Sequence, residues 1–179
     1  MRVLIACGGT GGHINPGLAI ADIIKSKYPD TEFLFAGTPK GMEAKLVPAA
    51  GYRFETIKVA GFQRRISLEN IGRNAKAVAY LITSGRRAKQ IIEGFKPDIA
   101  IGTGGYAAGP VIRKAARMGI PTAIHEQNAY PGVTNKLLSK EVDHVMLTVK
   151  EALNFMDGSK FEHTVTGLPV RSNIKNSIS

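Results

Sequence analysis

Residues 2–13 read RVLIACGGTGGH, a short apolar run followed at once by a glycine-rich turn. Residues 98–106 repeat this order as DIAIGTGGY, and both turns lead into stretches with the apolar spacing of a helix. A strand, a tight glycine turn and a helix start present unpaired backbone N–H groups to an anion. Two such turns face each other only where the strand order of a parallel sheet reverses, which is where ligands bind. The pattern therefore predicts a site for a phosphorylated ligand between the two turns.

Strand and helix patterns alternate along the whole chain, which predicts an α/β fold with a doubly wound, Rossmann-like parallel sheet. We expect one domain over residues 1–167 and the start of an interdomain linker over residues 168–179. The first helix is predicted to begin at Pro16, with Asn15 as its cap. Strands are predicted at about 2–6, 32–36, 53–58, 98–102, 121–125, 142–147 and 163–166. Helices are predicted at about 16–27, 40–49, 68–93, 108–118, 132–139 and 149–155.

Composition narrows the class of protein. The chain has 179 residues, of which 44% are hydrophobic and 21% charged, so it can bury a sizeable core. The single cysteine, Cys7, excludes a disulfide framework and is expected to be a buried, inert thiol. No apolar run approaches the ~20 residues of a membrane span, and the N-terminus has no signal peptide pattern. These features predict a soluble, cytoplasmic domain.

The net charge of +10 is concentrated in one segment. Residues 61–96 carry eight basic against two acidic side chains, which implies a polyanionic partner. Nucleic acid is not expected, because stacking aromatics and nucleic-acid-binding motifs are missing there. We predict a membrane-docking face, with a solvated basic helix as the alternative. The face comprises Phe62, Arg64, Arg65, Ile66, Arg73, Lys76 and Tyr80.

The glycine turns do not match the common nucleotide motifs. The first lacks the last glycine of a dinucleotide fingerprint, and neither ends in the Gly-Lys-Ser/Thr of a Walker loop. A nicotinamide enzyme is therefore not expected, and a nucleoside triphosphatase is excluded. The alternative to a ligand site, for a single glycine turn, is a plain strand-to-helix connection. The four histidines lack metal-ligand spacing, so we expect no bound metal and no cofactor.

Two sets of polar residues are candidate catalytic or binding residues at the edge of the sheet where the glycine turns lie. His13 follows the first turn, where a histidine suits proton abstraction from a sugar hydroxyl at neutral pH. Residues 125–128 read HEQN and follow the fifth predicted strand, so they open on the same edge of the sheet. The alternative for this second group is a hydrogen-bonded loop that caps the next helix.

These motifs together resemble the MurG family of N-acetylglucosaminyltransferases of peptidoglycan synthesis. The matching residues are Gly8 to His13 with Pro16 to Ala19, Gly102 to Tyr106 with Gly109-Pro110, His125 to Asn128 with Pro131-Gly132 and Asn135, and Gly167 with Pro169 to Arg171. The resemblance covers the N-terminal half of such an enzyme. It implies a GT-B glycosyltransferase, in which this half binds the acceptor and the missing C-terminal domain makes most donor contacts.

The resemblance also implies partners and residue roles. The donor is UDP-N-acetylglucosamine, and the acceptor is undecaprenyl-pyrophosphoryl-muramyl-pentapeptide at the cytoplasmic face of the cell membrane, with its anionic inner leaflet. His13 is the expected base, and Glu126 orients or replaces it. Thr10, Gly11, Gly12, Asn128 and Arg171 are expected at the donor, and Gly104, Gly105 and Tyr106 at the acceptor diphosphate. We expect this half alone to bind donor weakly and not to turn over.

Two other functions fit the same residues. One is a different nucleotide-sugar transferase or an epimerase-like GT-B protein that acts on another acceptor. The other is a membrane-docking subunit of a two-chain nucleotide-sugar transferase with a different lipid-linked acceptor. His13 argues against a pure docking role, because a docking subunit needs no base.

Overall fold

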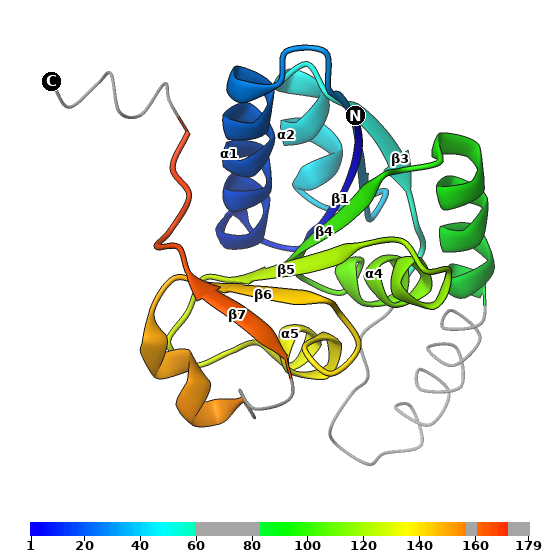
Figure 1. The fold of residues 1–179 in the computed structure, drawn as a ribbon. Helices are drawn as coiled ribbons and strands as arrows, with labels where there is room; N and C mark the ends of the chain where they lie inside the picture. Colours follow the sequence, from blue (N-terminus) through cyan, green and yellow to red (C-terminus); the bar gives the residue numbers. More distant parts are fainter. Residues whose placement is uncertain (60–82, 157–160, 172–179) are drawn as a thin grey trace, which may run out of the picture.

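The computed structural model describes residues 1–59, 83–156 and 161–171. Within them, one sheet of seven strands has the order β3-β2-β1-β4-β5-β6-β7, and all neighbouring strands pair in parallel (Figure 1). This is the predicted doubly wound α/β fold. The strands are β1 (Arg2–Cys7), β2 (Glu32–Gly37), β3 (Arg53–Thr56), β4 (Ile99–Gly104), β5 (Thr122–Glu126), β6 (His144–Leu147) and β7 (Glu162–Val165).

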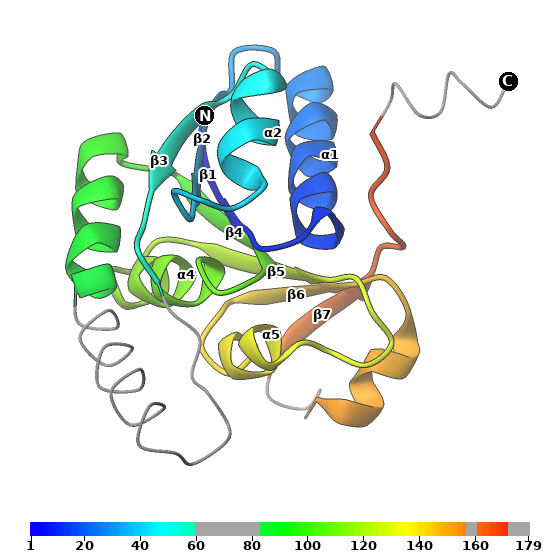
Figure 2. The same ribbon diagram turned by 180° about the vertical axis from the view of Figure 1, so that it is seen from behind.

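Helices cover both faces of the sheet (Figures 1 and 2). One face carries α1 (Gly11–Lys27) and α2 (Glu43–Ala49). The other carries the helical residues 83–95, α4 (Ala108–Arg117) and α5 (Val133–Leu138). A short 3-10 helix, η1 (Lys150–Phe155), precedes β7.

Strand β1 shows how the sequence builds the two cores. Side chains alternate across a strand, so Val3, Ile5 and Cys7 face α1 and α2. Leu4 and Ala6 face the opposite core, with α4 and residues 83–95. All five are fully buried, which is the continuous apolar run expected of a central strand in a two-faced parallel sheet. Cys7 is buried as expected, and burial raises its pKa to about 12, with a further contribution from the charge of Glu43.

The predicted strands are all present, but the start of the first helix was wrong. Helix α1 begins at Gly11, and Pro16 lies inside it rather than at its first position. The cause is local, because the N–H groups of His13 and Ile14 both donate to the carbonyl of Thr10, at 3.1 and 3.2 Å. The helix therefore starts one turn earlier than Asn15-Pro16 indicates, and His13 lies in its first turn.

The sheet changes direction between β1 and β4, where the chain winds outward to β2 on one side and to β5 on the other. The pairing of β1 with β4 shifts after Ala6, so Ala6 faces Gly102 and Cys7 faces Gly104. Strand β4 thus carries one extra residue, Thr103, at the switch point. The carboxyl ends of β1, β4 and β5 meet at this edge, as the glycine turns predict.

The predicted membrane-docking face lies outside the described residues, because its members all fall within 60–82. Arg87, a basic residue of the same charged segment, is described and is paired: its guanidinium donates to Glu55 at 2.5 Å and to the Thr56 carbonyl at 3.1 Å. Among the helices that the structure describes, none is long and apolar enough to cross a membrane.

Candidate functional site

The two glycine turns contact each other at the switch point. A Cβ on Gly104 would lie 2.7 Å from Nδ1 of His13, and a Cβ on Gly105 would overlap the backbone of Gly8. Both residues also have positive φ angles, of 103° and 84°, that side chains disfavour. The second turn needs glycine because it packs directly on the first turn and on the His13 ring.

The N-terminus of α1 is open toward the same space. Thr10 precedes the helix but does not cap it with its side chain, and the first N–H groups of a helix have no partner within it. Gly9, Thr10 and Gly12 are exposed, and Gly11 is half-buried. Without side chains at Gly11 and Gly12, an anionic ligand can approach these N–H groups and the positive end of the helix.

His13 is half-buried and held at three points. The Thr103 hydroxyl donates to the His13 carbonyl at 2.7 Å, which fixes its backbone. The ring lies over Gly104, and its Nδ1 is 3.1 Å from Oε1 of Gln127. The β4 bulge, the second glycine turn and the loop after β5 thus each fix one part of this residue.

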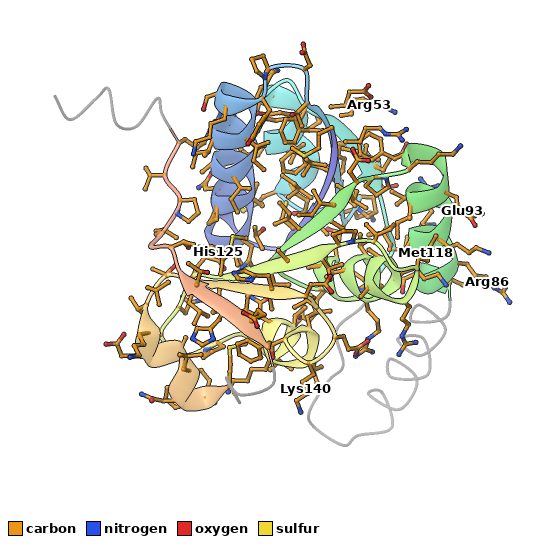
Figure 3. All side chains as sticks on the ribbon, viewed as in Figure 1. Arg53, Arg86, Glu93, Met118, His125 and Lys140 are labelled. Atoms are coloured by element: carbon orange, nitrogen blue, oxygen red, sulfur yellow. The ribbon has the colours of Figure 1, made fainter. Side chains whose placement is uncertain are left out.

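His125 is completely buried at the end of β5. Figure 3 shows it below α1, next to the segment that leaves β7. Its Nε2 lies 3.1 Å from the carbonyl of Gly167, and its Nδ1 lies 3.1 Å from Nε2 of Gln127. Burial lowers the pKa of His125, although the Gly167 carbonyl and the charge of Glu126 oppose that shift. His125 is therefore neutral in the folded protein near pH 7.

The carboxylate of Glu126 is almost fully buried and organises the loop that leads into α5. It accepts four hydrogen bonds of 2.9–3.0 Å, from the backbone and side chain of Asn128, the backbone of Gly132 and the side chain of Asn135. None of these four bonds goes to His13, whose Nδ1 instead lies beside Oε1 of Gln127. The bonds are those of a hydrogen-bonded loop before α5, and the role of Glu126 in orienting or replacing His13 stays a prediction.

Glu43 is a second buried carboxylate at this edge, and the sequence analysis missed it. It accepts the Gly9 N–H at 3.1 Å and both the N–H and hydroxyl of Thr38 at 2.8 and 2.6 Å. Burial alone would raise the pKa of Glu43, but these hydrogen bonds outweigh burial and lower it. Side chains at Gly8, Gly37 or Gly41 would collide with Glu43. These three glycines are the only feature of the sequence that relates to the buried position of Glu43.

The remaining predicted site residues divide into two groups. Tyr106 is 65% exposed and Asn128 is exposed, so both open toward solvent beside the turns. Arg171 lies elsewhere, because its Nε is 3.3 Å from the carboxylate of Asp22 in the middle of α1. Asp22 also accepts the Tyr52 hydroxyl at 2.6 Å, which raises the pKa of Tyr52 together with burial. The structure thus brings the turns, His13 and the HEQN loop together, and separates Arg171 from them.

The chain is similar to known proteins over most of its length. Residues 3–147 match the glycosyltransferase family 28 N-terminal domain. An Acetivibrio thermocellus protein named UDP-N-acetylglucosamine--N-acetylmuramyl-(pentapeptide) pyrophosphoryl-undecaprenol N-acetylglucosamine transferase is 53% identical over 96% of this chain and 45% of its own length. A protein of the same name from Ruminiclostridium cellulolyticum is 51% identical over 99% of this chain and 47% of its own length. The chain spans about half the length of these curated relatives.

Solved structures show the same fold. The crystal structure of Acinetobacter baumannii MurG superposes with a TM-score of 0.69 and 30% identity, over 82% of this chain and 41% of that one. A UDP-GlcNAc 2-epimerase from Neisseria meningitidis superposes with a TM-score of 0.63 over 99% of this chain and 50% of its own, but at 17% identity this likeness concerns the fold alone. With its sheet order, its paired glycine turns and the match over residues 3–147, the chain belongs to the N-terminal domain family of the family 28 glycosyltransferases, in the MurG group.

Proposed function

We propose that this chain is the acceptor-binding half of an inverting glycosyltransferase. The complete protein would move N-acetylglucosamine from UDP-N-acetylglucosamine to the lipid-linked N-acetylmuramyl-pentapeptide of peptidoglycan synthesis. The relatives at 51–53% identity carry this activity in their names, and this half supplies His13 as the proposed base.

One observation carries the proposal: the His13 ring lies where the two glycine turns meet, at the switch point of the sheet. There, His13 removes the proton of the muramyl 4-hydroxyl. The hydroxyl oxygen then forms a bond to the anomeric carbon of the donor, while the bond from that carbon to the UDP oxygen breaks. UDP leaves with the electron pair, and the configuration at the anomeric carbon inverts to give a β-1,4 link. His13 finally returns the proton to solvent.

The surrounding groups divide between the two substrates. Thr10, Gly11, Gly12 and Asn128 line the donor side, where the positive end of α1 stabilises the charge of the departing UDP. The exposed second turn, from Gly104 to Tyr106, takes the diphosphate of the acceptor in the same proposal. Arg171 reaches the donor only after its ion pair with Asp22 opens.

The C-terminal domain, which the relatives contain beyond the matched half, would supply the other wall of the cleft. The test is a fusion of this chain, joined at residues 168–171, to the C-terminal half of the Acetivibrio thermocellus relative. We expect the fusion to transfer N-acetylglucosamine to the muramyl lipid, and the chain alone to bind donor weakly without turnover, because one wall cannot exclude water. Submicromolar donor binding or ordinary turnover by residues 1–179 alone would refute this division of labour.

The lipid anchor of the acceptor places the site within reach of a bilayer, so we also propose peripheral binding at the cytoplasmic face of the membrane. The support is the sequence of the membrane-docking face, whose basic residues each add ~1 kcal/mol near an anionic surface. Sedimentation with anionic and neutral vesicles tests it. Substitution of Arg64, Arg65, Arg73 and Lys76 by glutamine should abolish the preference for anionic vesicles, and an unchanged preference would leave only a solvated basic segment.

A further inference from the structure

A chain of hydrogen bonds connects His13 to the segment that leaves the sheet after β7. It runs from Nδ1 of His13 to Oε1 of Gln127, and from Nε2 of Gln127 to Nδ1 of His125. It ends where Nε2 of His125 meets the carbonyl of Gly167. Each of these contacts is 3.1 Å long.

The direction of donation along these hydrogen bonds follows from groups that can only accept a hydrogen bond. Nε2 of Gln127 also lies 2.8 Å from the backbone carbonyl of His125, so the Gln127 group at that position must be its NH₂. The amide oxygen of Gln127 therefore faces His13, and the amide oxygen has no proton to give. His13 must donate, which requires the proton of its neutral ring to be on Nδ1.

The hydrogen bond between His125 and Gly167 gives the same direction of donation independently. The Gly167 carbonyl can only accept, so the proton of His125 is on Nε2 and its Nδ1 is free to accept from Gln127. His125 is completely buried, and burial favours the neutral ring that this arrangement needs. Two backbone carbonyls, at His125 and Gly167, thus fix the direction of donation, which runs from His13 through Gln127 and His125 to Gly167.

We propose that Gln127 is a positioning residue that holds neutral His13 in the Nδ1–H tautomer, so that Nε2 keeps its lone pair for the acceptor hydroxyl. The catalytic part of this inference rests on the proposed function, whereas the tautomer itself does not. A carboxylate commonly orients a catalytic histidine by accepting from one ring nitrogen. Here an amide oxygen has that place, and the amide in turn is oriented by His125.

The tautomers can be read directly by ¹⁵N NMR of the imidazole rings of this 19.2 kDa chain, at a pH where the histidines are neutral. We expect opposite tautomers in the two rings, with the proton of His13 on Nδ1 and that of His125 on Nε2. In Gln127→Met, which keeps the length of the side chain but removes both bonds, the His13 proton should move largely to Nε2. Gln127→Glu restores an acceptor oxygen and should return it to Nδ1. The matched control Gln90→Met, on the exposed surface of residues 83–95, should leave both rings unchanged.

Activity of the fusion protein supplies the second readout. Gln127→Met should lower kcat about 10- to 100-fold with little change in KM, less than the loss expected when the base itself is removed. A His13 proton on Nε2 in the unsubstituted chain, or on Nδ1 in well-folded Gln127→Met, would overturn the proposal. Because the NMR experiment needs neither donor nor acceptor, an inactive fusion would count against the proposed function without changing the tautomer result.

Discussion

Two segments at the same edge of the sheet use polar groups in opposite ways. The turn at residues 8–13 leaves the first N–H groups of α1 without a side-chain cap, and two of its glycines, Gly9 and Gly12, are exposed. The loop at residues 125–135 instead buries His125, Glu126 and Asn135, with four donors on the carboxylate of Glu126 and partners on both ring nitrogens of His125. In the proposed function the first segment meets the ligand, and the buried groups of the second segment hold the first in place. Gln127 joins them, because it bonds both histidines.

One substitution in each segment of the fusion protein gives the largest expected difference between them. His13→Ala should lower kcat roughly 10²–10⁴-fold with a small change in KM, because a general base acts mainly in the transition state. Glu126→Gln should lower kcat much less, since its carboxylate bonds the loop rather than His13. Steady-state kinetics of both variants measures kcat and KM. A larger kcat loss in Glu126→Gln than in His13→Ala would make Glu126 the base and His13 the supporting residue.

The contact between the glycine turns can be isolated with two matched alanine variants. Gly9 and Gly105 have similar positive φ angles, of 89° and 84°, so alanine strains the backbone about equally at both. A Cβ at Gly9 meets nothing within 4 Å, whereas one at Gly105 overlaps the backbone of Gly8. Gly105→Ala should therefore cost about 1–3 kcal/mol more unfolding free energy than Gly9→Ala, as overpacking does.

Urea denaturation of the two alanine variants measures that difference. Equal losses in both variants would mean that backbone strain alone explains the glycines and that the turns do not depend on close contact. Such a result would also weaken the placement of His13, whose ring lies over the neighbouring Gly104.

The sequence was sufficient to predict the fold and the meeting of the two glycine turns at one edge of the sheet. Alternating strand and helix patterns and two glycine turns have strong local signals, and they specify a parallel sheet with its ligand crevice. The bonding partners within the site were harder to predict, because they depend on which side chains meet across the edge. Nothing local in the sequence distinguishes Gln127 from Glu126 as the partner of His13, and Glu43 bonds Gly9 from 34 residues away. The position of Arg171 beside Asp22 is likewise a tertiary contact over 149 residues.

The scaffold role of the second segment predicts a loss of stability when its carboxylate is neutralised. In Glu126→Gln, an NH₂ group replaces one of the oxygens that now accept from Asn128, Gly132 and Asn135. We expect a loss of about 2 kcal/mol of unfolding free energy, the scale of a buried hydrogen bond to a charged group. The exposed Glu151→Gln is the matched control and should change stability by less than about 0.5 kcal/mol. A Glu126→Gln variant as stable as this control would show that the loop does not depend on the carboxylate.

The smallest effect that we expect is a pH dependence of stability from His125. Its pKa in the folded protein lies below the ordinary value of 6.5, because burial disfavours the charged ring, so the unfolded chain takes up this proton first as the pH falls. The contribution of His125 to stability is therefore fully present above pH 6.5 and declines below it, by at most about 1.4 kcal/mol per pH unit, until the folded protein also binds the proton.

Urea denaturation at several pH values between roughly 7.5 and 5 measures this slope. The slope should be absent in His125→Gln and unchanged in His163→Gln, which replaces an exposed histidine. If the slope survived in His125→Gln, another group would be its source, and the neutral, fully bonded His125 that distinguishes the scaffold loop from the open turn would lose its support.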